Sequence, residues 1–174
     1  MHRNLVVWQT AALLVLGLGL SQPATAGKLT NAVEGYLKND TWNPQPLDDL
    51  NGWEMAYQGT DDSWTCVALV FEDRQQFLFY SVLDVTVESS RRDEMAHFLN
   101  RANHQMVMGN FELNMDMGEL RFKTSIDVEG GDLGGTMLHN LLYTNVLTMD
   151  RYISGINAVH QGADPLLAIE GVEG

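Results

Sequence analysis

The sequence has 174 residues, of which 45% are hydrophobic and 19% charged, a composition typical of a globular domain with a real core rather than of a disordered chain. Acidic residues outnumber basic ones 23 to 10, giving a formal charge of −13 at pH 7. A field of that sign repels phosphate backbones, and no basic cluster is longer than Arg91-Arg92. Nucleic acid is therefore not expected as a partner.

Residues 1–26 are predicted to be a cleavable secretory signal. Arg3 precedes an apolar stretch, and Ala24-Thr25-Ala26 then provides a small-residue cleavage site. The mature chain, residues 27–174, would be exported to the periplasm or another extracytoplasmic space, with no membrane attachment left. The apolar stretch 5–20 is short for a membrane span. Two alternatives stay open: an uncleaved membrane anchor, and an N-terminal helix that belongs to the core of a cytoplasmic protein.

The first predicted element of the mature chain is a short helix. Apolar residues at helical spacing indicate it over residues 29–37, and Asn39-Asp40 closes it. A connector with two prolines follows at 41–49. Three strands are then predicted, at residues 53–59, 63–71 and 75–87, and the short turns between them favour an antiparallel meander. The middle strand is apolar on both faces and holds Cys66, the only cysteine, which we expect to be a buried, inert thiol.

An amphipathic helix over residues 91–107 and a β-hairpin between Gly109 and Gly130 come next. A turn centred on Met117-Gly118 matches apolar with apolar residues and acid with base. The pairs predicted by this register are Met115–Leu120, Leu113–Phe122, Glu112–Lys123 and Asn114–Arg121. The hairpin is therefore expected to support the fold rather than carry chemistry.

The last predicted element is a long helix over residues 138–159 with a broad apolar band. The band is wider than one sheet face requires. Either the helix lies deep in the core, or part of the band forms a partner or dimer surface. The residues proposed for that surface are Met149, Tyr152, Ile153 and Ile156.

The order α-βββ-α-ββ-α predicts a single α+β domain with helices packed on an antiparallel sheet. Its core is expected to cover residues 29–162. The tail, residues 163–174, is expected to fray.

The sequence shows no constellation of catalytic residues, and neither catalytic residues nor cofactors are expected. His97 and His104 are seven residues apart on one helix, about 10 Å along its axis, which is too far to share a metal ion. Together with Arg101 they are interpreted as a solvated polar stripe. An enzyme, the less favoured class, would have to use Asp116, Glu119 or Cys66.

The loop 127–132 carries the only weak candidates for a metal site, the carboxylates of Asp127, Glu129 and Asp132. The loop does not fit the helix-loop-helix calcium pattern, because the twelfth position is Leu138. Asp132 is more simply explained as a helix cap.

Three segments resemble the YbjN-domain family, described as bacterial sensory-transduction regulators, and in particular its cyanobacterial type. They are FLNRANHQMVMGNFEL (98–113), GELRFKTSIDVEG (118–130) and LLYTNVLTMDRYISGINAV (141–159). The resemblance covers about residues 29–170. It implies a fold similar to type III secretion chaperones, which dimerise and bind segments of partner proteins, and it supplies no catalytic residues. Members of this kind are generally cytoplasmic, so the signal-like N-terminus is a departure from the family.

The expected function is thus a non-enzymatic, exported module that binds a protein or peptide, with a chaperone-like or regulatory role and a homodimer as one expected form. The alternative is a small-ligand or calcium sensor that uses the acidic loop 127–132.

Overall fold

The computed structural model describes residues 27–104 and 106–174, so the predicted signal at 1–26 lies outside the described part. The helices are α2 (Lys28–Asn39), α3 (Arg92–His104), α4 (Gly135–His160) and α5 (Pro165–Glu173). The strands are β1 (Gln45–Pro46), β2 (Gly52–Gln58), β3 (Ser63–Phe71), β4 (Gln76–Thr86), β5 (Asn110–Leu113) and β6 (Glu119–Asp127). Two short 3-10 helices, Glu72–Arg74 and Ser89–Arg91, complete the described elements. The predicted α+β class is confirmed; the short β1, the final helix α5 and these two 3-10 turns were not expected.

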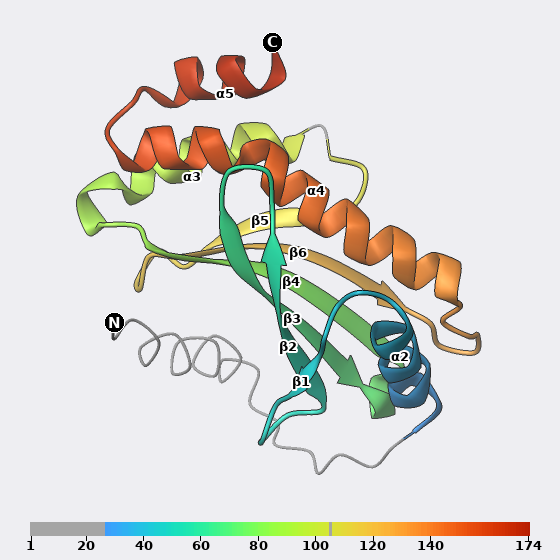
Figure 1. The fold of residues 1–174 in the computed structure, drawn as a ribbon. Coiled ribbons are helices and arrows are strands. Elements are labelled where there is room, and N and C mark those ends of the chain that lie inside the picture. The colour runs from blue at the N-terminus through green and yellow to red at the C-terminus, as the bar shows by residue number, and fades with distance from the viewer. Residues whose placement is uncertain (1–26, 105) are drawn as a thin grey trace.

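The strands form one antiparallel sheet in the order β1-β2-β3-β4-β6-β5. Strands β2, β3 and β4 pair in sequence order, so the predicted meander is confirmed. Helices α3 and α4 lie across one face of the sheet, and α5 lies on the far side of these two helices (Figure 1).

The core lies between the sheet and the helices, because alternate residues of every long strand point to that face. Four phenylalanines are completely buried there: Phe77, Phe79, Phe98 and Phe122. Cys66 is buried as predicted, and burial raises the pKa of its thiol to about 12. It is therefore not a thiolate at neutral pH.

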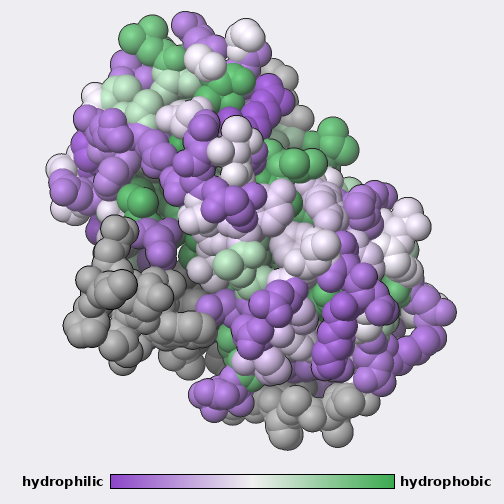
Figure 2. Space-filling model, in the orientation of Figure 1, coloured by the Kyte–Doolittle hydropathy of each residue, from purple (hydrophilic) through white to green (hydrophobic). Residues whose placement is uncertain are grey.

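The tail was predicted to fray, and this prediction is wrong: residues 165–173 form α5. Asp164 caps the helix by accepting hydrogen bonds from the backbone N–H groups of Leu166 and Leu167, and Pro165 occupies its first turn. The helix buries Ala168 and Ile169. Leu166 and Leu167 stay 47% and 68% exposed. In Figure 2, apolar residues reach the surface at the top of the view, where Figure 1 places α5.

The predicted hairpin register is wrong by two residues. The observed pairs are Asn110–Lys123, Phe111–Phe122, Glu112–Arg121 and Leu113–Leu120. The connection is a five-residue loop, 114–118, in which the Asn114 side chain accepts hydrogen bonds from the N–H groups of Asp116 and Met117. Gly118 ends the loop in a left-handed conformation, with φ of 81°. Because a shift of two preserves the strand period, the predicted inner and outer faces are unchanged.

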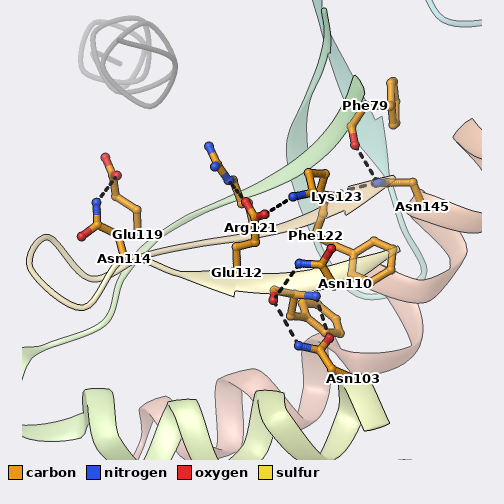
Figure 3. A network of polar contacts seen from close by, with 11 residues as sticks. Phe79, Asn103, Asn110, Glu112, Asn114, Glu119, Arg121, Phe122, Lys123 and Asn145 are labelled. Atoms are coloured by element: carbon orange, nitrogen blue, oxygen red, sulfur yellow. Dashed lines mark hydrogen bonds and ion pairs between the residues drawn. The ribbon is translucent and has the colours of Figure 1, made fainter. Parts of the chain in front are cut away.

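A buried amide holds α4 to the sheet. Asn145 is fully buried, and its Nδ2 group donates to the carbonyl oxygens of Phe79 on β4 and Phe122 on β6, at 3.0 and 3.2 Å (Figure 3). It also donates to the Thr124 hydroxyl at 3.2 Å. These bonds fix α4 across the centre of the sheet. Helices α3 and α5 pack against α4.

Among residues 27–104 and 106–174, no helix is both long and apolar enough to cross a membrane.

Candidate functional site

A groove of about 790 Å³ lies between α3 and α5. We call it the α3–α5 groove, and the residues that line it are Ala96, His97, Asn100, Arg101, Asn103, His104, Ile169 and Glu173. It exists because α3 is amphipathic: the helix buries Met95, Phe98, Leu99 and Ala102 against the core and turns its polar side outward. The fold thus presents a polar helix face that α5 borders.

Four side chains of the groove repeat at helical spacing along α3: His97, Asn100, Arg101 and His104. All four are exposed. Within the described part of the chain, none of the four side chains forms a hydrogen bond or an ion pair. They differ in this from Asn103, which donates to the carbonyl oxygen of Phe111 and accepts from its N–H group (Figure 3). The four side chains are free to bind something from outside the chain.

The opposite wall of the groove is made by α5. Ile169 supplies an apolar surface, and Glu173 accepts a 2.6 Å hydrogen bond from the Tyr152 hydroxyl. Burial, together with this hydrogen bond and the Glu173 charge, raises the pKa of Tyr152 to about 12, so the hydroxyl remains a donor at neutral pH. The Glu173 carboxylate is therefore already engaged within the chain.

The groove combines hydrogen-bonding side chains on α3 with the apolar side chain of Ile169 on the α5 wall. Arg101 carries a permanent positive charge in a chain whose net charge is −13. Apolar side chains lie close by in the sequence, since Val107 and Met108 follow α3 and are exposed. This arrangement can bind a ligand or a partner through hydrogen bonds and apolar contact.

The hairpin's outward residues are, in contrast, paired with one another. Glu112 bonds both Arg121, at 2.7 Å, and Lys123 (Figure 3). Burial would raise the pKa of Glu112, but the two cations outweigh it and hold that pKa below its usual range. The Arg121 guanidinium also lies 4.4 Å from the centre of the Tyr80 ring. The predicted Glu112–Lys123 contact is thus present, but as part of a half-buried network of three charges.

The four residues predicted for a partner or dimer surface are buried inside the chain. Met149, Tyr152, Ile153 and Ile156 are between 0% and 5% exposed. The apolar band of α4 is broad because the helix packs against the sheet, α3 and α5 together. As folded, none of the four residues is available to a partner.

The acidic loop does not bring its carboxylates to one point. Asp127 accepts hydrogen bonds from the Gln76 side chain and from the N–H group of Glu129, whereas Asp132 forms an ion pair with Lys28. Asp132 is also not the cap of α4, which begins after Gly134 without a side-chain cap. No group of three metal-binding side chains occurs in residues 27–104 and 106–174. No observation favours the calcium alternative.

Of the three residues considered for an enzyme, Cys66 lies apart from the other two. Cys66 is enclosed in β3, while Asp116 and Glu119 belong to the β5–β6 hairpin, with β4 between β3 and β6 in the sheet. The carbonyl oxygen of Asp116 accepts from Arg92, so this loop is tied to the start of α3.

Sequence reasoning noticed the His97–Arg101–His104 stripe but not its opposite wall. The missing signal was Asp164-Pro165, a capping residue followed by a proline suited to the first turn of a helix. With that signal α5 could have been predicted. The polar stripe on α3 would then have been expected to lie in a groove beside α5 rather than on an open surface.

The sequence profile of the YbjN family, described as "Putative bacterial sensory transduction regulator", matches residues 30–157. The chain belongs to the YbjN family. The predicted resemblance to the family is thereby confirmed, and the match runs from within α2 to within α4, so it does not include α5. No curated protein matches the chain in sequence.

Three solved structures are similar to this YbjN-family chain. One is YbjN from E. coli, described as "a putative transcription regulator", with 14% identity and a TM-score of 0.59 over 76% of this chain and 92% of that one. The HopA1–SchA chaperone–effector complex has 17% identity and a TM-score of 0.48, over 74% of this chain and 96% of that one. The ExsC–ExsE complex has 14% identity and a TM-score of 0.43, over 71% of this chain and 88% of that one. At such identities the likeness is one of fold.

Proposed function

We propose that this YbjN-family protein is a non-enzymatic module that binds a protein or peptide in the α3–α5 groove, in a chaperone-like or regulatory role. The observation that carries the proposal is the row of four exposed, hydrogen-bonding side chains on α3 without a recorded partner. A recognition surface of this kind combines an apolar surface with a few oriented polar groups. Membership of a family described as sensory-transduction regulators supports a role exercised through partners rather than through chemistry.

Substitution of Arg101 tests this function. Arg101→Glu reverses the one permanent charge of the groove, so the amount of partner that co-purifies with the tagged protein from its native host should fall at least about 10-fold, as loss of a charged interface contact allows. Arg74→Glu is the matched control, because Arg74 is also exposed but follows β3 at a distance from the groove. If both variants and the wild type captured the same amount of partner, the groove would not be the binding site.

Export is also part of the proposal. If the chain is cut after Ala26, the new α-amino group belongs to Gly27, which lies against the Glu72 carboxyl group so closely that a Cβ at residue 27 would overlap it. The amine would then face an opposite charge. The intact mass of the protein from its native host should begin at Gly27, and a full-length mass would contradict export by cleavage.

We include a homodimer as a second proposed association. Light scattering on the purified protein checks it, and a single-chain mass at all concentrations would exclude it.

A further inference from the structure

The position of α5 sets it apart from the rest of the domain. The family match ends at residue 157, so α5 lies beyond the part of the chain that the family shares. It packs on the outer side of α3 and α4 (Figure 1), through Ala168, Ile169 and Val172. The last helix therefore lies outside the matched region and covers a surface of it.

The surface under α5 is shaped to receive a helix. A Cβ at Gly155 of α4 would lie 2.6 Å from Cζ of Phe98 and 2.8 Å from Cγ2 of Val172, so only glycine allows this approach. The rings of Phe98 and Tyr152 meet edge to face, with centroids 6.4 Å apart. The Tyr152 hydroxyl then donates to Glu173. Together these three residues, Phe98, Tyr152 and Gly155, form what we call the helix trough.

Ala168, Ile169 and Val172, together with the Tyr152–Glu173 hydrogen bond, hold α5 in the trough. The helix has nine residues, a length that is not stable on its own in water, so it persists only while docked. Arg91 bonds the carbonyl oxygens of Val159 and Ala163, which fixes the chain up to the start of the helix. The connection before it contains Gly162 in a left-handed conformation, with φ of 107°. The chain is thus anchored up to Ala163, the point from which α5 would be released.

The α3–α5 groove borders the trough, because α3 forms one side of both and α5 lies between them. Ile169 and Glu173 belong to the groove lining and also to the residues by which α5 is seated. When α5 leaves, groove and trough become one surface, with the free polar stripe of α3 along its edge.

We propose that the helix trough is a helix-binding site, that α5 occupies it in the absence of a partner, and that a partner's amphipathic helix replaces α5 there. The seated residues of α5 define the chemistry of that helix: alanine and isoleucine side by side, a β-branched residue three positions on, and then a carboxylate for the Tyr152 hydroxyl. The inference rests on the proposed function in giving the site a protein partner. It can be tested without knowing that partner.

The test compares two substitutions on α5 in the full chain. Ile169→Asp places a charge on the seated side and should release the helix, whereas Leu167→Asp places the same charge on the outer side. The probe is a fluorescein-labelled peptide of residues 163–174, followed by fluorescence anisotropy. Ile169→Asp should bind the peptide at least about 10-fold more tightly than the wild type or Leu167→Asp does. In the latter two, α5 competes with the peptide, and the apparent affinity falls with the fraction of molecules whose trough is empty. The same peptide carrying Ile169→Asp should not bind.

A milder variant guards against misfolding of the first. Glu173→Ala in the full chain removes only the acceptor of the Tyr152 hydrogen bond, while the peptide keeps its own Glu173, so peptide binding should rise by a smaller factor with the helical circular-dichroism signal retained. The proposal would be overturned if the wild type, Ile169→Asp and the milder variant bound the peptide equally, or if none of them bound it. So would a wild-type dimer that Ile169→Asp converts to a monomer, since the trough would then hold α5 of a second copy. Any of these results would leave the Arg101 test of the groove unaffected.

Discussion

One residue, Gly155, determines how closely three helices meet. It is buried in α4, and its missing side chain leaves room for Phe98 of α3 and Val172 of α5. Glycine in the middle of a helix is intrinsically unfavourable, by about 1 kcal/mol relative to alanine. The chain tolerates this cost because close packing of the helices offsets it.

Gly155→Ala should therefore destabilise the protein, in spite of its better helix propensity. The added methyl group would overlap Phe98 and Val172, and overpacking of this kind costs about 1–3 kcal/mol. Gly171→Ala in α5 is the control, because a Cβ there meets no atom within 4 Å and should stabilise the helix by up to about 1 kcal/mol. Urea unfolding followed by circular dichroism measures both. A stabilised Gly155→Ala would contradict the packing described.

At the scale of elements, α2 depends on a residue from a distant turn. Its own cap residue, Gly27, offers no side chain, and Glu72 after β3 accepts hydrogen bonds from the N–H groups of Leu29 and Thr30 and from the Thr30 hydroxyl. Burial alone would raise the pKa of Glu72, but these bonds outweigh it and lower the pKa below the ordinary value. The first helix is thus tied to the sheet by a carboxylate.

This contact predicts a pH dependence of stability. Since the folded-state pKa of Glu72 is lowered, its contribution is fully present above the ordinary value of 4.5 and is lost as the pH falls through the lowered pKa. Glu72→Gln should cost about 1 kcal/mol at pH 7, as loss of a helix cap does, and progressively less towards pH 3. Urea unfolding at several pH values checks this, with the exposed Glu88→Gln as control. A difference that does not change with pH would contradict the assignment.

Much of the fold could be predicted because its elements have clear periods. Strand β3 was predicted with its observed limits, and the inner and outer faces of the hairpin were correct. The register of the hairpin was wrong because the Asn114 side chain stabilises a longer loop than the strand pattern alone indicates.

Prediction of the site was less complete, for a reason of tertiary structure. Periodicity finds the polar stripe on α3, but it cannot tell whether a second helix borders that stripe. The broad band on α4 was likewise correctly identified as apolar. Only the fold shows that the sheet, α3 and α5 cover Tyr152 and its neighbours.

At the scale of the whole molecule, the sheet serves as a platform and the helices carry the candidate surface. The outward charges of the hairpin are paired within the chain, whereas the row on α3 beside α5 is free. We therefore propose that recognition takes place on the helical side of this YbjN-family domain.

The measurement that tests this assignment most directly is photo-crosslinking in the native host. A photoreactive amino acid at position 100, in the groove, should give a discrete cross-linked adduct with a partner, because Asn100 is exposed and lines the proposed site. The same amino acid at position 129, in the exposed acidic loop, should give none. An adduct at position 129 with none at position 100 would contradict the account and move recognition away from the groove.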